Sequence, residues 1–132
     1  MKPLPQRWLK QSEADLQAAQ DSRSSGHYEW ACFQAQQSAE KALKALLYQQ
    51  GFTSIISRSV ADLVLEASKS FVKLAQLEPQ ARFLDSFYLS ARYPNALASE
   101  RAPVDYHSRE EAERCLSCAE SILAAAKSTM PH

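Results

Sequence analysis

The sequence predicts an all-α fold, an up-and-down bundle of about five helices. Two observations carry this prediction. Apolar residues recur at the three- and four-residue spacing of amphipathic helices along most of the chain, and helix-starting residues precede several of these segments. The 132 residues include only 2 Gly, with 45% hydrophobic and 23% charged residues, which is typical of a globular domain. We therefore expect residues 1–132 to form a single domain.

The first two expected helices form a hairpin. Pro3 and Pro5 precede the first helix, which carries one apolar stripe and ends near Asp21. After a turn rich in Ser and Gly, a long helix covers residues 28–50. Gly51 closes it, because helices commonly end on a residue in the left-handed conformation. Small Ala and Ser residues in the middle of the long helix predict a close approach by its neighbour.

Three further helices are expected. Residues 59–62 read as a capping box, with Ser59 as the cap and Asp62 reaching back to it, and start a third helix that extends to Leu74. A fourth covers residues 78–92, because Pro79 fits a first helical turn and Pro94 stops the helix. A long connection follows, and a second capping box at Ser108 starts the last helix.

The fourth expected helix has apolar residues on two faces. Leu84, Tyr88 and Ala91 form one stripe, and Phe83 and Phe87 form another. A surface helix of a monomer rarely needs two apolar faces. We therefore predict a homodimer with Phe83 and Phe87 at its interface.

Charge and cysteine content limit the classes of function. Lys+Arg and Asp+Glu both number 15, so any site for a polyanion must be a local cluster, and there is no strong nucleic-acid signature. No apolar run reaches the roughly 18 residues of a membrane span, and three cysteines without a secretory context indicate free thiols in the cytoplasm. Cys115 and Cys118 lie on an apolar stripe without two further ligands, so we expect packing and no metal.

The long second helix also carries a family resemblance. Residues 26–46 follow the pattern Gly-x-Tyr-x-x-Ala-x-Phe-x-Ala-Gln-Gln-x-Ala-Glu-Lys-Ala-Leu-Lys-Ala-Leu, which resembles the second helix of the HEPN family. Arg92-Tyr93-Pro94 resembles a second HEPN landmark at the expected distance. The resemblance covers Trp8 to Leu123 and implies a single HEPN domain.

Within the family, several residues resemble the C-terminal HEPN domain of the chaperone-like protein sacsin. They include Arg7-Trp8-Leu9, residues 29–33 and the two cysteines of the last helix. Residues 36–45 look more like generic prokaryotic HEPN proteins, and Arg58-Ser59 stands where those proteins commonly have His-Ser. The sacsin resemblance implies a C-terminal module of a larger chaperone-like protein that forms homodimers and binds a nucleotide, ATP or GTP.

Arg92, Tyr93 and Lys41 are the candidate nucleotide-binding residues. The two cations would bind phosphate, and the ring of Tyr93 would stack on a base. Further cations could contribute to such a cavity: Arg58, Arg82 and Lys44. The alternative is structural, with Tyr93 packed on the bundle and Arg92 paired with a carboxylate such as Glu40.

An enzyme is the alternative function. Catalytic HEPN members cut RNA without metal, using an Arg and a His separated by four to six residues. Arg101 and His107 match this spacing, but a motif this short occurs by chance about as often as not, and Pro103 lies between them. We therefore predict no catalytic residues. The alternatives are a toxin-type, metal-independent endoribonuclease using Arg101 and His107, or a structural domain that only pairs chains.

Overall fold

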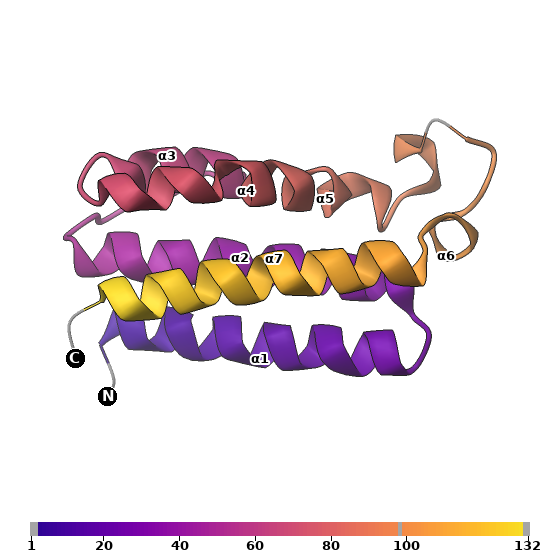
Figure 1. Ribbon diagram of the computed structural model, residues 1–132, viewed down its shortest axis with the longest axis horizontal. Helices are drawn as coiled ribbons and strands as arrows, with labels where there is room; N and C mark the ends of the chain where they lie inside the picture. Colours follow the sequence, from indigo (N-terminus) through magenta and orange to yellow (C-terminus); the bar gives the residue numbers. More distant parts are fainter. Residues whose placement is uncertain (1–2, 98, 131–132) are drawn as a thin grey trace.

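The computed structural model describes residues 3–97 and 99–130, and all regular structure in these residues is helical. The predicted all-α bundle is confirmed. Two long helices form an antiparallel hairpin, a third long helix packs against both, and a layer of shorter helices covers the other side (Figure 1). The helices are α1 (Leu4–Ser24), α2 (Tyr28–Gln49), α3 (Val60–Ser68), α4 (Glu78–Asp85), α5 (Phe87–Ser90), α6 (Pro103–Tyr106) and α7 (Arg109–Thr129).

The predicted third and fourth helices are shorter than expected. α3 ends at Ser68, and a 3-10 helix, η1 (Val72–Leu77), follows it. The fourth helix is divided at Ser86, whose hydroxyl donates to the carbonyl of Phe83 at 2.6 Å. Serine hydroxyls that bond to the preceding turn compete with the helical pattern and bend helices, which accounts for the division.

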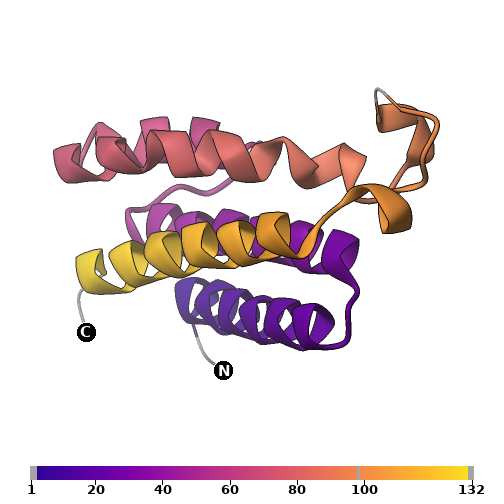
Figure 2. The ribbon, with the colours of Figure 1, turned by 45° about the vertical axis from the view of Figure 1, so that its right-hand side comes forward.

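The expected long connection before the last helix contains two short elements. They are η2 (Pro94–Ala96) and α6, which stand together at one end of the bundle (Figure 2). α6 begins at Pro103, a residue suited to the first helical turn. Within the described ranges, no helix combines the length and the hydropathy that crossing a bilayer requires.

α1 and α2 approach closely at small residues, as the sequence predicts. The hydroxyl of Ser12 donates to the carbonyl of Ser38 at 2.6 Å, and the hydroxyl of Ser38 donates to the carbonyl of Ser12 at 2.8 Å. Ala35 and Ala39 beside them are fully buried. Gly51, two residues after the end of α2, adopts a φ of +103°, which confirms its predicted role in ending the helix.

The start of α3 is capped from another helix. Ser59 Oγ accepts from the backbone N–H of Asp62 at 3.1 Å, as a capping box requires. The acidic partner is Asp85 of α4, which accepts from the N–H groups of Val60 at 2.7 Å and Ala61 at 2.9 Å. The prediction that Asp62 supplies this carboxylate is therefore wrong. The second predicted capping box, at the start of α7, is complete.

Phe87 belongs to the core of the monomer. Its side chain is 4% exposed and contacts the rings of Phe83 at 5.1 Å and His107 at 5.3 Å between centroids. The inference that Phe87 lies on a free face is wrong, because the segment that joins α6 to α7 folds over it. Phe83 is half-buried, with the guanidinium of Arg114 lying 3.9 Å from its ring centre.

Candidate functional site

The cysteines pack in the core, as predicted. Cys32, Cys115 and Cys118 are buried free thiols. A hydrogen bond with Cys32, together with burial, raises the pKa of Cys115, and burial raises the pKa of Cys118. Cys115 and Cys118 are therefore poor nucleophiles. The residues the structure describes contain no group of three or more His, Cys, Asp or Glu placed to hold a metal ion.

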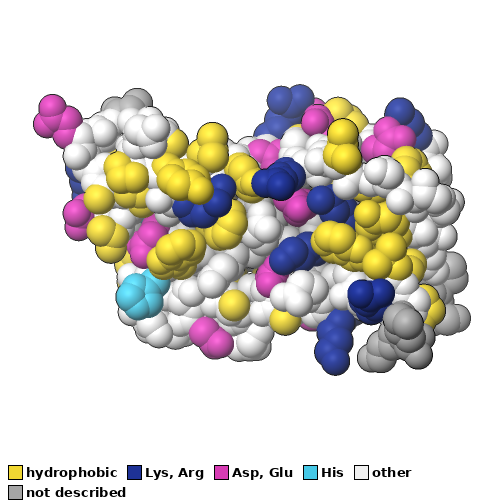
Figure 3. Space-filling model, turned by 180° about the vertical axis from the view of Figure 1, so that it is seen from behind, with side chains coloured by type: hydrophobic (Ala, Val, Ile, Leu, Met, Phe, Trp, Pro, Cys, Tyr) yellow, Lys and Arg dark blue, Asp and Glu magenta, His cyan; other side chains and the backbone are white. Residues whose placement is uncertain are grey.

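A polar hollow of about 400 Å³ lies between α2, the loop before α3 and α5. Four residues of its lining come from one face of α2, at the three- and four-residue spacing that places side chains in a row. The lining residues are Phe33, Gln37, Glu40, Lys44, Arg58, Tyr88 and Arg92. Figure 3 shows Lys and Arg side chains among hydrophobic groups across the middle of the face opposite to that of Figure 1.

Arg92 is held by aromatic rings. Its Nε donates to the carbonyl of Tyr88 at 2.9 Å, and its guanidinium lies 4.4 Å from the ring centre of Phe33 and 4.7 Å from that of Tyr88. The ring of Tyr93, which is half-exposed, lies 4.8 Å away on another side. Cation–π contacts therefore orient Arg92, in place of the pairing with Glu40 considered from the sequence.

Arg58 crosses the hollow from the opposite side. Its Nη1 donates to the hydroxyl of Tyr88 at 2.8 Å, and this hydrogen bond raises the pKa of Arg58. Its backbone carbonyl accepts from the side-chain amide of Gln36 at 3.1 Å, which ties the loop to α2. The exposed guanidinium thus has the hydroxyl of Tyr88 as its hydrogen-bond partner in the hollow.

A buried ion pair forms the base of the hollow. Lys44 Nζ donates to Glu40 Oε2 at 3.1 Å, and both side chains are less than one-tenth exposed. The ammonium of Lys44 also lies 5.5 Å from the ring centre of Trp8. Burial raises the pKa of Glu40, and the hydrogen bond from Lys44 opposes that rise.

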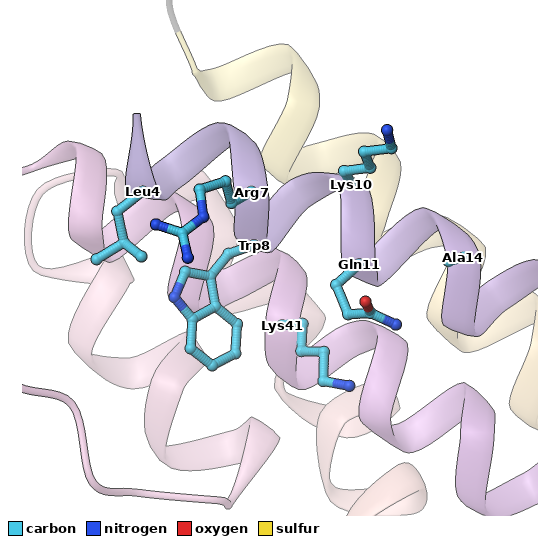
Figure 4. A pocket seen from close by; sticks show the side chains of 7 residues that line it. All are labelled: Leu4, Arg7, Trp8, Lys10, Gln11, Ala14 and Lys41. Atoms are coloured by element: carbon cyan, nitrogen blue, oxygen red, sulfur yellow. The ribbon is translucent and has the colours of Figure 1, made fainter. Parts of the chain in front are cut away.

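The third predicted nucleotide-binding residue lines a different hollow. Lys41 Nζ is paired with Asp15 Oδ2 at 2.5 Å and borders a hollow of about 630 Å³ along α1. Figure 4 shows Trp8 of α1 and Lys41 of α2 at this second hollow, with Arg7 beside the indole. Lys41 therefore does not share a hollow with Arg92.

Two of the other cations considered from the sequence, Arg58 and Lys44, do lie in the polar hollow. The third, Arg82, is paired with Glu78 on α4. Phe33 was not predicted as part of the site, although its helical spacing from Gln37 was a usable signal. The role of Tyr88 was not predicted either, because it depends on tertiary packing.

The structure buries one member of the predicted alternative catalytic pair. The His107 side chain is 2% exposed, and its Nε2 lies 2.9 Å from the carbonyl oxygen of Ser90. Arg101 donates to the carbonyl of Asp105 through a guanidinium nitrogen. A general base must come within hydrogen-bond reach of the proton that it removes, and in this structure the buried imidazole of His107 contacts the carbonyl of Ser90.

A family model described as the HEPN domain matches residues 5–129. The chain belongs to the HEPN family. Solved HEPN-like structures support this assignment. The protein TT1696 from Thermus thermophilus superposes with a TM-score of 0.89 at 35% identity, over 96% of this chain and 98% of that one. ST0689, described as an archaeal HEPN homologue, gives a TM-score of 0.78 at 38% identity, over 97% and 98% of the two chains.

A curated relative carries a functional name. The Methanocaldococcus jannaschii protein called "Putative toxin MJ1304" is 29% identical over 124 residues, which cover 88% of this chain and 81% of that protein. The resemblance to sacsin stays a prediction, because neither the family model nor these relatives point to that branch of the HEPN family.

Proposed function

We propose that this HEPN domain is a non-catalytic, homodimeric module that binds a nucleotide, ATP or GTP, in the polar hollow. One observation carries the proposal. Arg58, Arg92 and Lys44 line a single hollow with aromatic side chains, in a chain whose formal net charge is zero. Such a local cluster of cations is suited to phosphate groups. A role within a larger chaperone-like protein is proposed only from the resemblance to sacsin.

Arg58, Arg92 and Tyr93 would each bind a different part of the nucleotide. Arg58 is exposed and can exchange the hydroxyl of Tyr88 for a phosphate oxygen, gaining a charged acceptor in place of an uncharged one. Arg92, already oriented by three rings, loses little freedom when it binds a second phosphate oxygen. The half-exposed ring of Tyr93 beside it offers a surface for a base.

Removing either arginine should weaken ATP binding. Loss of a charge-assisted phosphate contact costs about 1.5–3 kcal/mol, roughly ten-fold or more in affinity, so Arg58→Ala and Arg92→Ala should each show this loss in calorimetric titration. Arg82→Ala is the matched control, because Arg82 is exposed and ion-paired on α4 outside the hollow. Lys41→Ala, which alters the α1 hollow, shows which of the two hollows binds ATP. If the parent binds no ATP or GTP at millimolar concentration, the proposal is wrong.

A toxin-type endoribonuclease is the second candidate, and the name of the relative MJ1304 favours it. The burial of His107 opposes it. We expect purified protein to leave a mixed single-stranded RNA intact without metal, and His107→Ala to behave like the parent. Cleavage by the parent that disappears in the variant would show that Arg101 and His107 are catalytic after all.

The homodimer is proposed with Phe83 at the interface, since part of its ring remains accessible on α4. Sedimentation equilibrium should give a dimer mass at micromolar protein. Phe83→Ala should raise the dissociation constant, because truncating an aromatic anchor costs about 2 kcal/mol. Leu65→Ala, at an exposed position of α3, is the control and should not change it. A monomer at every concentration would contradict the dimer.

A further inference from the structure

One carboxylate oxygen of Glu40 accepts no hydrogen bond from the described residues. The residue is 5% exposed, and Oε2 accepts from Lys44. Oε1 is buried and has no hydrogen-bond partner among the described residues, although Glu40 lines the polar hollow. Buried carboxylate oxygens are nearly always paired, so an unpaired one in a binding hollow marks the position of a ligand donor.

The charges around Glu40 restrict what that donor can be. Lys44, Lys41 and Arg58 all act on this carboxylate, and Arg92 lines the same hollow. With these cations present, a further cationic group would be repelled and an anionic ligand is favoured. A neutral donor carried by an anion therefore suits both Oε1 and the surrounding cations.

The number of unpaired oxygens on Glu40 further restricts which ligand group can bond to it. A guanine edge offers two neighbouring N–H donors and is suited to a carboxylate with both oxygens available. Oε2 of Glu40 already accepts from Lys44, so Oε1 is the oxygen of this carboxylate without a protein partner among the described residues. A single sugar hydroxyl suits one such oxygen better than a paired donor edge does.

Resting on the proposed nucleotide function, we propose that Glu40 Oε1 accepts a hydrogen bond from one ribose hydroxyl, so that the hollow discriminates against the deoxy analogue that lacks this hydroxyl. Oε1 is buried in this structure, and Arg58, which lines the same hollow, bridges to the hydroxyl of Tyr88. When Arg58 turns to a phosphate, this bridge opens and the sugar reaches Glu40. Phosphate binding and sugar recognition are thus coupled through one side chain.

The test needs no variant, because the ligand itself can be changed. The parent protein is titrated calorimetrically with ATP, 2′-deoxy-ATP and 3′-deoxy-ATP. We expect one deoxy analogue to bind at least about ten-fold more weakly than ATP, the loss that follows from one hydrogen bond to a charged acceptor. GTP should bind within about three-fold of ATP, since the base is not read by Glu40.

Two variants assign the preference to Glu40. Glu40→Gln keeps the shape of the side chain but breaks the buried pair with Lys44, so the double variant Glu40→Leu/Lys44→Met is tested beside it as an apolar replacement of the whole pair. In either variant that folds, ATP and the deoxy analogues should bind with equal affinity. Equal affinities in the parent, or a ten-fold preference for GTP without discrimination of the sugar, would overturn the inference while nucleotide binding stands. Absence of all binding would overturn both.

Discussion

Phe87→Ala is expected to lower the free energy of unfolding by about 3–5 kcal/mol, because it removes a large buried ring and leaves a cavity. The ring is 4% exposed and packs between Phe83 and His107, where α5 meets the segment before α7. Urea unfolding followed by circular dichroism measures the loss. The matched control is Leu89→Ala, two residues away and 53% exposed, which should change the unfolding free energy by less than about 1 kcal/mol.

This pair of variants also separates core packing from assembly. If Phe87 served only a dimer interface, its truncation would shift the sedimentation mass and leave the unfolding of the monomer unchanged. The burial of Phe87 predicts the opposite result for unfolding. A loss of less than about 1 kcal/mol in Phe87→Ala would contradict its place in the core.

Asp85→Ala is expected to cost about 3 kcal/mol, the second-largest effect. Its carboxylate accepts from two backbone N–H groups at the start of α3 and from the hydroxyl of Ser59 at 2.9 Å. Hydrogen bonds to a charged group contribute about 1.5–3 kcal/mol each, although they are not additive. Asp62→Ala, at an exposed position in the first turn of the same helix, should cost less than about 1 kcal/mol. Equal losses in the two variants would show that Asp85 is not the principal cap.

Local features of the fold were predictable from the sequence. The Ser108 capping box closes within four residues, so its pattern contains all the necessary information. The cap of α3 depends on Asp85, which lies 25 residues from Val60 in the chain. The local pattern at Ser59 therefore led to the wrong carboxylate, Asp62. Likewise, the second apolar face of the fourth helix was visible, but sequence periodicity does not say which element covers it.

In the candidate site, too, local spacing was predictable from the sequence and tertiary contacts were not. The row on α2 that includes Gln37, Glu40 and Lys44 follows from helical spacing alone. Lys41 occupies the adjacent position in the chain, yet its pairing with Asp15 of α1 places it at the other hollow. Arg58 comes from a loop, whose position relative to α2 is determined by tertiary contacts that a single sequence does not specify.

The most direct test of nucleotide binding in the polar hollow is a titration of isotope-labelled protein with ATP, followed by two-dimensional amide NMR. We expect the largest chemical-shift changes at Arg58, Tyr88 and Arg92, with the amides of Arg7 and Lys10 in the α1 hollow almost unmoved. Changes confined to the α1 hollow, or no changes at millimolar ATP, would contradict the account.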